Sequence, residues 1–127
     1  MNLPLVSIIT PSYNSSKFIE ETIASVQAQT YSHWEMLITD DGSTDNSFEI
    51  IKEICKKDSR IKLFSIKNAG PAVARNNSIK YAKGKYLAFL DSDDLWMPNK
   101  LALQINFMNF VYSLMFVRTN VINEIYN

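Results

Sequence analysis

The chain has 127 residues, of which 46% are apolar, and this is enough for one compact domain with a single buried core. Thirteen basic residues balance thirteen acidic ones, so no general positive field gathers nucleic acid or anionic lipid, and we expect no nucleic-acid partner. Cys55 is the only cysteine, which excludes an internal disulfide or a cysteine-rich zinc site and favours a reducing compartment.

The first elements along the chain are a predicted strand and a predicted helix. Residues 5–10 form a short, mostly apolar run, which is typical of a strand covered on both faces. Over residues 18–26 apolar side chains recur at helical spacing. We expect Ser15 or Ser16 to cap the start of this helix and the helix to end near Thr30.

A second strand and helix follow in the same order. Residues 34–39 are again of the buried-strand type and lead into an acidic turn over 40–45. Residues 48–57 present a second apolar helical face, with Lys56 and Lys57 in the last turn, where they complement the helix dipole.

Two more strands and a third helix complete the alternation. Residues 61–66 and 86–90 are the predicted third and fourth strands. Between them, Pro71 opens a helix and Gly84 is expected to close it with a left-handed cap. Strict alternation predicts an α/β fold, a Rossmann-like, mostly parallel sheet with helices on both faces, and one domain over residues 1–127.

The ends of the chain bear on its location. Residues 1–4 carry neither a basic region nor a cleavage site, so we expect no signal peptide and a cytoplasmic protein. Residues 101–117 are apolar but are interrupted by polar side chains. We favour a buried helix followed by a strand over 110–117, and leave peripheral contact with the inner face of the membrane as the alternative.

Strand order predicts where the loops meet. In a doubly wound sheet the fourth strand flanks the first on the side away from the second, so the loops after these strands border one crevice. Tyr13, Asp41 and Asp93 should therefore lie close together.

The triplet Asp91-Ser92-Asp93 is a candidate metal site. Its two carboxylates lie two residues apart in a turn, and oxygen ligands suit Mg²⁺ or Mn²⁺ bound to a diphosphate. The alternatives are that these side chains are simply solvated, or that the neighbouring Asp94 caps the next helix.

The acidic turn after the second strand also has two interpretations. Its aspartates, Asp40, Asp41 and Asp45, either satisfy turn and helix-start amides or supply a carboxylate that accepts the imide hydrogen of a uracil ring. In the second case Tyr13 offers a stacking face.

Three further polar side chains lie near the predicted crevice. Arg75 and Lys67 are the nearest cations, and Arg75 pairs either with a phosphate or with Asp91 or Asp41. Asn68 is placed to contact the base edge, although an ordinary turn asparagine explains it equally well.

Together these elements resemble the inverting nucleotide-sugar glycosyltransferases of family 2, which have the GT-A fold. The match runs from about Val6 to Gln104, with residues 105–127 as its continuation. Its pieces are Val6–Asn14, Asp40–Asp45, Asn68–Gly70 leading to Ala74–Asn76, Gly84–Tyr86, and Leu90–Asp94 with Trp96, Pro98, Lys100 and Gln104. Ser78 departs from the pattern, since many relatives have glycine there.

The resemblance implies a role for each matching residue. Asp41 would bind the uracil edge, Asp91 would face the ribose, and Asp93, with Asp91, would ligate Mn²⁺ or Mg²⁺. The other residues implied to line the nucleotide site are Pro11, Tyr13, Asn14, Asn68, Arg75 and Ser92.

The implied activity is transfer of a sugar from a UDP-sugar to a hydroxyl of a saccharide or lipid-linked acceptor, with inversion, in cell-surface polysaccharide or glycolipid synthesis. Family members continue into an acceptor-binding half that carries a general base. We identify no such base here, since Glu124 is the only carboxylate after Asp94 and no motif supports it. The chain therefore resembles a C-terminally truncated donor-binding portion.

Other functions stay open on the sequence. One is a truncated nucleotide-sugar-binding module without transferase activity of its own. A sugar-phosphate nucleotidyltransferase is disfavoured because no glycine-rich basic loop follows the first strand, where 11–14 reads Pro-Ser-Tyr-Asn. We also expect self-association through an exposed apolar face around Phe107, Phe110 and Phe116.

Overall fold

The structure is a computed structural model that describes residues 3–126, with side chains described for residues 3–114. Its elements are β1 (Val6–Ser12), α1 (Ile19–Gln27), β2 (Trp34–Asp40), α2 (Ser47–Lys57), β3 (Ile61–Ser65), α3 (Pro71–Lys80), β4 (Tyr86–Phe89) and α4 (Lys100–Tyr126). The four strands form one parallel sheet in the order β3-β2-β1-β4. The predicted alternation and the α/β fold class are confirmed.

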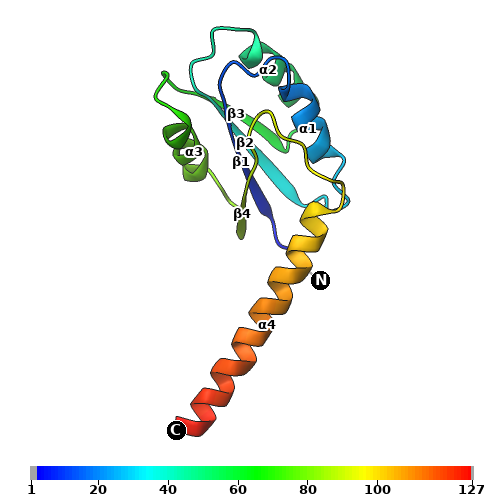
Figure 1. Ribbon diagram of the computed structural model, residues 1–127, viewed down its shortest axis with the longest axis vertical. Coiled ribbons are helices and arrows are strands. Elements are labelled where there is room, and N and C mark those ends of the chain that lie inside the picture. The colour runs from blue at the N-terminus through cyan, green and yellow to red at the C-terminus, as the bar shows by residue number, and fades with distance from the viewer. Residues whose placement is uncertain (1–2, 127) are drawn as a thin grey trace.

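Helices cover both faces of the sheet, with α1 and α2 on one side and α3 on the other (Figure 1). The larger core lies on the α1 and α2 face, where Ile8 and Met36 from the sheet pack with Ile23 and Ile51 from the helices. Every residue of β1 and β2 is buried, whereas the edge strands β3 and β4 are only partly covered. Continuous apolar runs therefore marked the two central strands correctly.

Hydroxyl groups as well as apolar contacts hold α3 against its face of the sheet. Ser78 is fully buried, its Oγ donates to the Leu37 carbonyl at 3.1 Å, and it lies 2.7 Å from the Thr39 hydroxyl. The serine at this position is thus accommodated by hydrogen bonds to β2.

The predicted helix ends need three corrections. The N-cap of α1 is Phe18 and makes no side-chain cap hydrogen bond, so neither Ser15 nor Ser16 caps the helix, and α1 ends at Gln27 rather than near Thr30. Gly84 does not cap α3, which ends at Lys80. A Cβ on Gly84 would lie 2.6 Å from the Ser7 amide nitrogen, so glycine is needed there for close approach of two backbones.

The largest error concerns the C-terminal segment. The predicted strand over 110–117 is wrong, because α4 continues through it to Tyr126 (Figure 1). No glycine or proline occurs in α4, so nothing interrupts the helix once it has begun at Lys100. Its first turns are buried through Leu101 and Ile105.

Over residues 100–114, the part of α4 whose side chains are described, most side chains are exposed, so the expectation of a buried helix is wrong there. Phe107 and Phe110 are 64% and 61% exposed, which confirms the expected exposed apolar face at these two positions, whereas the side chain of Phe116 lies outside the described residues. Among the residues that the structure describes, no helix has the length and apolar content needed to cross a membrane.

A buried carboxylate holds the turn that leads into β4. Glu35 accepts hydrogen bonds from the Ser7 hydroxyl at 2.6 Å and from the Lys83 amide at 2.7 Å, and the Gly84 amide donates to Ser7 Oγ at 2.8 Å. Glu35 is only 6% exposed. It therefore joins β1, β2 and the start of β4.

We predict that Glu35→Ala lowers the free energy of unfolding by about 2–4 kcal/mol, because a buried hydroxyl and a partly buried amide lose their acceptor. Urea unfolding followed by circular dichroism measures this loss. The exposed Glu49→Ala should change the free energy by no more than about 0.5 kcal/mol. Equal unfolding midpoints for the two variants would contradict the role given to Glu35.

Candidate functional site

A pocket of about 510 Å³ opens at the carboxyl ends of the strands, between the loops that follow β1, β2 and β4. The sheet order places this crevice where the chain crosses from β3 back past β1 to β4, the position that ligands favour in open α/β sheets. All nine predicted site residues line it, namely Pro11, Tyr13, Asn14, Asp41, Asn68, Arg75, Asp91, Ser92 and Asp93. Lys67 is exposed and does not line the pocket.

Asp41 is the buried carboxylate of this pocket, with 3% of its surface exposed. Its two oxygens accept hydrogen bonds from the Ala69 amide at 2.7 Å and the Gly70 amide at 3.0 Å. The Asn68 side-chain amide donates to the Asp41 backbone carbonyl at 2.9 Å. The same Asn68 amide also donates to Asp41 Oδ2 at 3.3 Å, the oxygen that accepts from Gly70. Asp41 thus fixes the loop that leads into α3, and the second lone pair of Oδ1 is left for a ligand.

The other two aspartates of this loop have structural roles. Asp40 accepts from the Ser43 amide at 3.0 Å and the Ser43 hydroxyl at 2.6 Å, which closes the turn after β2. Asp45 accepts from the amide of Ser47 at 2.9 Å and from the Ser47 hydroxyl, and so satisfies the start of α2. For Asp40 and Asp45 the turn and helix-start interpretation is therefore correct.

Asp45 also makes the domain sensitive to acid. Partial burial raises the pKa of this carboxyl, but hydrogen bonds from Ser47 and Ser16 lower it more strongly, from an ordinary 3.8 to about 2. A hydrogen bond from the Arg60 guanidinium lowers the pKa of Asp58 to about 2 as well.

We predict that the stability contributed by these two carboxylates is complete above about pH 4 and is lost as the pH falls towards about 2, because protonation favours the unfolded chain. Asp45→Asn should therefore show a smaller loss of unfolding free energy over this range than the wild type. Urea unfolding at a series of pH values measures both slopes, and equal slopes would contradict the prediction.

Asn14 joins the loops after β1 and β2. It has a φ of 48°, in the left-handed region, and its side-chain oxygen accepts from the Thr44 amide at 2.8 Å. Its own amide donates to the Ser43 hydroxyl at 3.0 Å. Asn14 thus lines the pocket while its side chain supports the pocket wall.

Two aromatic side chains stand at the pocket, each about half exposed. Tyr13 lies in the loop after β1, as predicted. Phe18 was counted in the helical pattern of residues 18–26, but it lies at the N-cap of α1 and lines the pocket. Helical spacing alone does not reveal this, because the residue falls in register with Thr22, four positions further along the chain. The other lining residues that the sequence missed are Ser12, Ser15, Gly70 and Pro71.

Arg75 reaches the acidic turn after β4 from α3. Its guanidinium lies 3.1 Å from a carboxylate oxygen of Asp91, so the ion pair expected with Asp91 is present. The Thr22 hydroxyl of α1 donates to the Ser92 carbonyl at 3.0 Å, which fixes the turn against α1. Asp94 is not a helix cap, because α4 begins only at Lys100.

The turn after β4 offers carboxylate oxygens that could bind a divalent cation together with a phosphate. Asp91 and Asp93 are exposed carboxylates on the pocket wall. Within the described part of the chain, no group of three or more His, Cys, Asp or Glu side chains is placed to hold a metal. Mg²⁺ is commonly held by one or two carboxylates together with substrate phosphates, and this arrangement suits that mode.

Residues 7–124 match the family model described as "Glycosyl transferase family 2". The chain belongs to this family. The fold is that of the GT-A glycosyltransferases, and the family and fold expected from the sequence motifs are both confirmed.

Relatives in the family are substantially longer. The chain is 51% identical over 106 residues to TuaG, a glycosyltransferase of Bacillus subtilis assigned to teichuronic acid biosynthesis, and covers 42% of it with 83% of its own length. It is 52% identical over 105 residues to the Escherichia coli protein WfgD, named as a UDP-Glc:alpha-D-GlcNAc-diphosphoundecaprenol beta-1,3-glucosyltransferase. This match covers 82% of the chain and 41% of WfgD. The chain thus spans about two fifths of these relatives.

Two solved structures with nucleotide ligands have the same fold. Staphylococcus aureus TarS in complex with UDP superposes with a TM-score of 0.76 at 30% identity, covering 82% of this chain and 32% of TarS. The mannosyltransferase PcManGT of Pyrobaculum calidifontis, in complex with GDP-Man and Mn²⁺, gives 0.69 at 28% identity, covering 73% and 28%.

Proposed function

We propose that this chain supplies the donor site of an inverting glycosyltransferase that uses a UDP-sugar and a divalent metal. The observation that carries the proposal is the convergence of Tyr13, Asp41, Arg75 and the Asp91–Asp93 turn on one pocket, from loops far apart in sequence. An aromatic ring can stack on a nucleobase, and a buried carboxylate can accept the imide hydrogen of that nucleobase. A cation suits the diphosphate, and two exposed carboxylates suit a divalent metal.

In this proposal Asp41 binds the nucleobase of the donor. Because two backbone amides and the Asn68 side chain hold its carboxylate in place, the free lone pair of Oδ1 is fixed in direction before a ligand arrives. An imide N–H of uracil donates to such an acceptor, and guanine presents a different edge with an amino group. TarS structures contain UDP and UDP-GlcNAc, which supports a uracil nucleotide here, and PcManGT with GDP-Man is the reason to test guanine.

The diphosphate lies towards Arg75 and the Asp91–Asp93 turn in our proposal. Asp93, with Asp91, would hold Mn²⁺ or Mg²⁺, and a bound metal would stabilise the negative charge of the leaving diphosphate. Arg75 now neutralises Asp91 at 3.1 Å, and it would instead pair with a phosphate once the ligand arrives. Asp91 would also face the ribose, Asn68 would assist at the base edge, and Pro11, Asn14 and Ser92 would complete the wall of the nucleotide site.

The reaction we propose is direct displacement at the anomeric carbon by an acceptor hydroxyl, which requires a base to take up its proton. Relatives such as WfgD act on a lipid-linked acceptor, which supports cell-surface polysaccharide or glycolipid synthesis at the inner face of the membrane. The acceptor and the sugar would be selected by residues outside the pocket described above.

A second candidate function is a nucleotide-sugar-binding module without transferase activity of its own. One observation favours it: the carboxylates that line the pocket, in the described part of the chain, are Asp41, Asp91 and Asp93, and all three are assigned to the donor. Glu124 lies outside the residues whose side chains are described, so it adds no support for a base.

Isothermal titration calorimetry of the chain with UDP and GDP, each with and without Mn²⁺, tests the donor site. We expect UDP to bind about tenfold or more tightly than GDP, and Mn²⁺ to strengthen UDP binding. If neither nucleotide binds, or if Mn²⁺ has no effect, the proposal is wrong. Release of UDP from a panel of UDP-sugars then separates the two candidates, because turnover excludes the inert module and binding without turnover favours it.

A further inference from the structure

We propose that Asn14 is a positioning residue, which holds the Tyr13 ring in place for stacking on the nucleobase and does not itself bind the ligand. This inference rests on the donor site proposed above, because that proposal assigns Tyr13 to the base. The family resemblance places Asn14 only among the residues that line the nucleotide site, whereas its hydrogen bonds lead to another loop.

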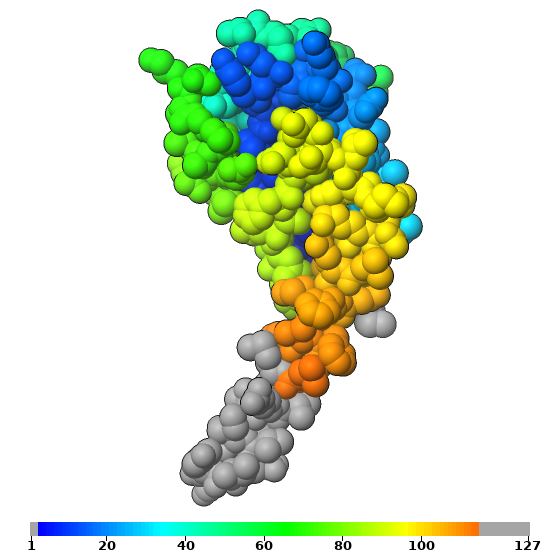
Figure 2. Space-filling model, viewed as in Figure 1, coloured from blue at the N-terminus to red at the C-terminus, as the bar shows by residue number. Residues whose placement is uncertain are grey.

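The loop after β1 is bonded to the loop after β2 on both sides of Tyr13. On one side the Ser12 carbonyl accepts from the Asp41 amide at 2.8 Å. On the other side the Asn14 amide donates to the Ser43 hydroxyl at 3.0 Å. Figure 2 shows this contact at the end of the domain away from α4, where blue residues of the first loop lie against cyan-green residues of the second. The backbone that carries Tyr13 is therefore tied at two neighbouring points.

The Asn14 side chain makes the strongest link between these loops. Its oxygen accepts from the Thr44 amide at 2.8 Å, and the Thr44 hydroxyl and the Asp45 amide donate to the same oxygen at 3.3 Å. Asn14 has a φ of 48°, a left-handed conformation that asparagine adopts more readily than most residues. Directly after it the Ser15 amide donates to the Ser47 hydroxyl at 2.8 Å, so the contact continues to the start of α2.

The other side of this contact is itself fixed. The Ser43 amide and hydroxyl donate to the two carboxylate oxygens of Asp40 at 3.0 Å and 2.6 Å. Asp40 is 3% exposed, so this anchor lies in the body of the domain. The hydroxyl that accepts the Asn14 amide is therefore held in one orientation, and the position of Asn14 is set from the buried end of β2.

This arrangement matters because packing alone leaves Tyr13 free to move. Its side chain is 51% exposed and lines the pocket. A ring on a mobile loop loses conformational freedom when a base binds, whereas a ring on a fixed backbone loses less and so binds more tightly. Asp41 belongs to the loop that holds Asn14, so the stacking face and the carboxylate keep their separation before a ligand arrives.

A direct contact between Asn14 and the ligand is the competing explanation. Three donors already converge on the Asn14 side-chain oxygen, which leaves its NH₂ group for such a contact. The two explanations differ in a double-mutant cycle. A direct contact survives removal of the Tyr13 ring, whereas a positioning effect disappears with the ring that it positions.

Calorimetry with UDP and Mn²⁺ on the wild type, Asn14→Gly, Tyr13→Ala and the double variant tests the proposal, with circular dichroism to verify the fold. Glycine tolerates the φ of 48°, so Asn14→Gly removes the side chain without straining the backbone. We expect each single variant to weaken UDP binding by about fivefold or more, and the double variant to bind UDP no more weakly than Tyr13→Ala alone.

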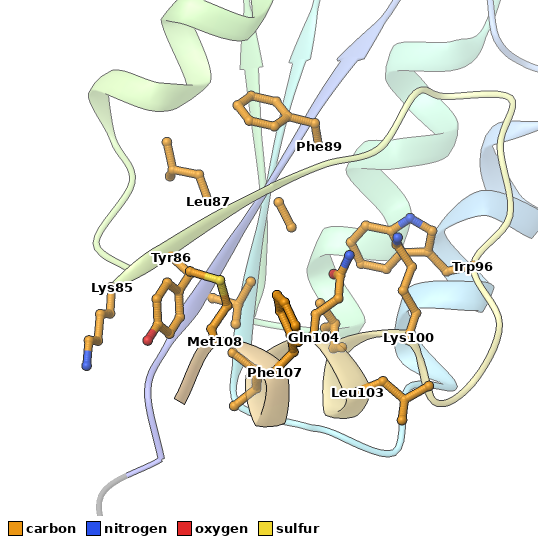
Figure 3. A pocket seen from close by; sticks show the side chains of 14 residues that line it. Lys85, Tyr86, Leu87, Phe89, Trp96, Lys100, Leu103, Gln104, Phe107 and Met108 are labelled. Carbon is orange, nitrogen blue, oxygen red and sulfur yellow. The ribbon is translucent and has the colours of Figure 1, made fainter. Parts of the chain in front are cut away.

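Two control variants should bind UDP as the wild type does. Asn46→Gly makes the same exchange at an exposed asparagine of the loop after β2, which makes no side-chain cap hydrogen bond and does not line the pocket. Phe107→Ala tests where UDP binds. Phe107 lines a second hollow, of about 800 Å³, between β4 and α4, and this hollow shares no lining residue with the donor pocket (Figure 3).

Hydrogen exchange of the Thr44 amide, followed by NMR without any nucleotide, measures the loop contact independently of the ligand. Because this amide donates to Asn14 at 2.8 Å, we expect its exchange to be about tenfold faster or more in Asn14→Gly and unchanged in Phe107→Ala. Unchanged exchange in Asn14→Gly would show that the side chain does not hold the loops together, and would overturn the proposal.

Three binding results would also overturn it. Asn14→Gly could leave UDP affinity unchanged, Asn46→Gly or Phe107→Ala could weaken binding as much as Asn14→Gly does, or Asn14→Gly could weaken binding equally with and without the Tyr13 ring. The last result would assign Asn14 to the ligand itself. A wild type that binds no UDP is a different outcome, because it shows that the donor-site proposal is wrong and the positioning role falls with it.

Discussion

Asp41→Ala is expected to lower the free energy of unfolding by about 2–4 kcal/mol and to abolish measurable UDP binding, because one buried side chain serves both the loop and the ligand. In the wild type the carboxylate accepts the Ala69 amide at 2.7 Å and the Gly70 amide at 3.0 Å. Alanine leaves both N–H groups without their acceptor and so loosens the start of α3, which carries Arg75.

The structure around Asp41 allows little compensation for this loss. A Cβ on Gly42 would lie 2.9 Å from the Asn68 amide nitrogen, so the two loops are already in close contact. Water entering from the pocket would replace the carboxylate only in part, because each of its two oxygens accepts a separate backbone amide. The cost should therefore appear as lost stability and as a displaced wall of the pocket.

Two variants separate the structural effect from the ligand effect. Asp41→Asn keeps one oxygen acceptor but turns an NH₂ group towards the other backbone amide. We therefore expect about half the stability loss of Asp41→Ala, together with the same loss of UDP affinity as in Asp41→Ala. Asp94→Ala, at an exposed aspartate that does not line the pocket, should behave as the wild type. Urea unfolding and calorimetry measure the two effects. An Asp41→Ala protein of unchanged stability would show that Asp41 does not hold the loop before α3. One that binds UDP normally would show that Asp41 does not bind the nucleobase.

The sheet and the position of the pocket were predictable because each depends on local pattern and topology. Continuous apolar runs identified β1 and β2, which are the fully buried strands. Right-handed alternation then required β4 to flank β1, and this alone brings the loop of Tyr13 beside that of Asp93. What each lining residue binds stays a prediction.

The hydrogen-bond partners of the site residues were not predictable in the same way. Residue type and spacing alone did not rank the three aspartates of this loop, and the family resemblance singled out only Asp41. The structure gives Asp40 to a turn, Asp45 to the start of α2, and Asp41 to the loop before α3. These assignments depend on which backbone amides lie within reach, and that is set by packing between loops far apart in sequence. Asn14 is a further example, since its side chain supports a neighbouring loop.

The errors in the last third of the chain have a different origin. Residues 110–117 are rich in β-branched and aromatic side chains, which favour a strand, but intrinsic preference is weak when a helix already begun at Lys100 meets no glycine or proline. Gly84 was misassigned because glycine has two uses, a left-handed cap and a close backbone contact, and sequence does not distinguish them.

Asp93→Ala should remove the effect of Mn²⁺ on UDP binding while leaving the fold intact. Asp93 is exposed, so its loss should change the free energy of unfolding by no more than about 0.5 kcal/mol. In our proposal it contributes an oxygen ligand to a metal held between the turn and the diphosphate. Without it we expect the Mn²⁺-dependent gain in UDP affinity, about tenfold or more in the wild type, to disappear.

The neighbouring aspartates supply the controls that make this result specific. Asp94→Ala removes an equally exposed carboxylate one residue away, outside the pocket lining, and should keep the Mn²⁺ effect. Asp91→Ala should differ from both, because it also frees Arg75 from its 3.1 Å ion pair; UDP binding without metal should then strengthen as the guanidinium becomes free for a phosphate. If Asp93→Ala and Asp94→Ala have the same effect on the Mn²⁺ dependence, the turn acts only through its overall charge, and the metal site proposed at Asp93 is wrong.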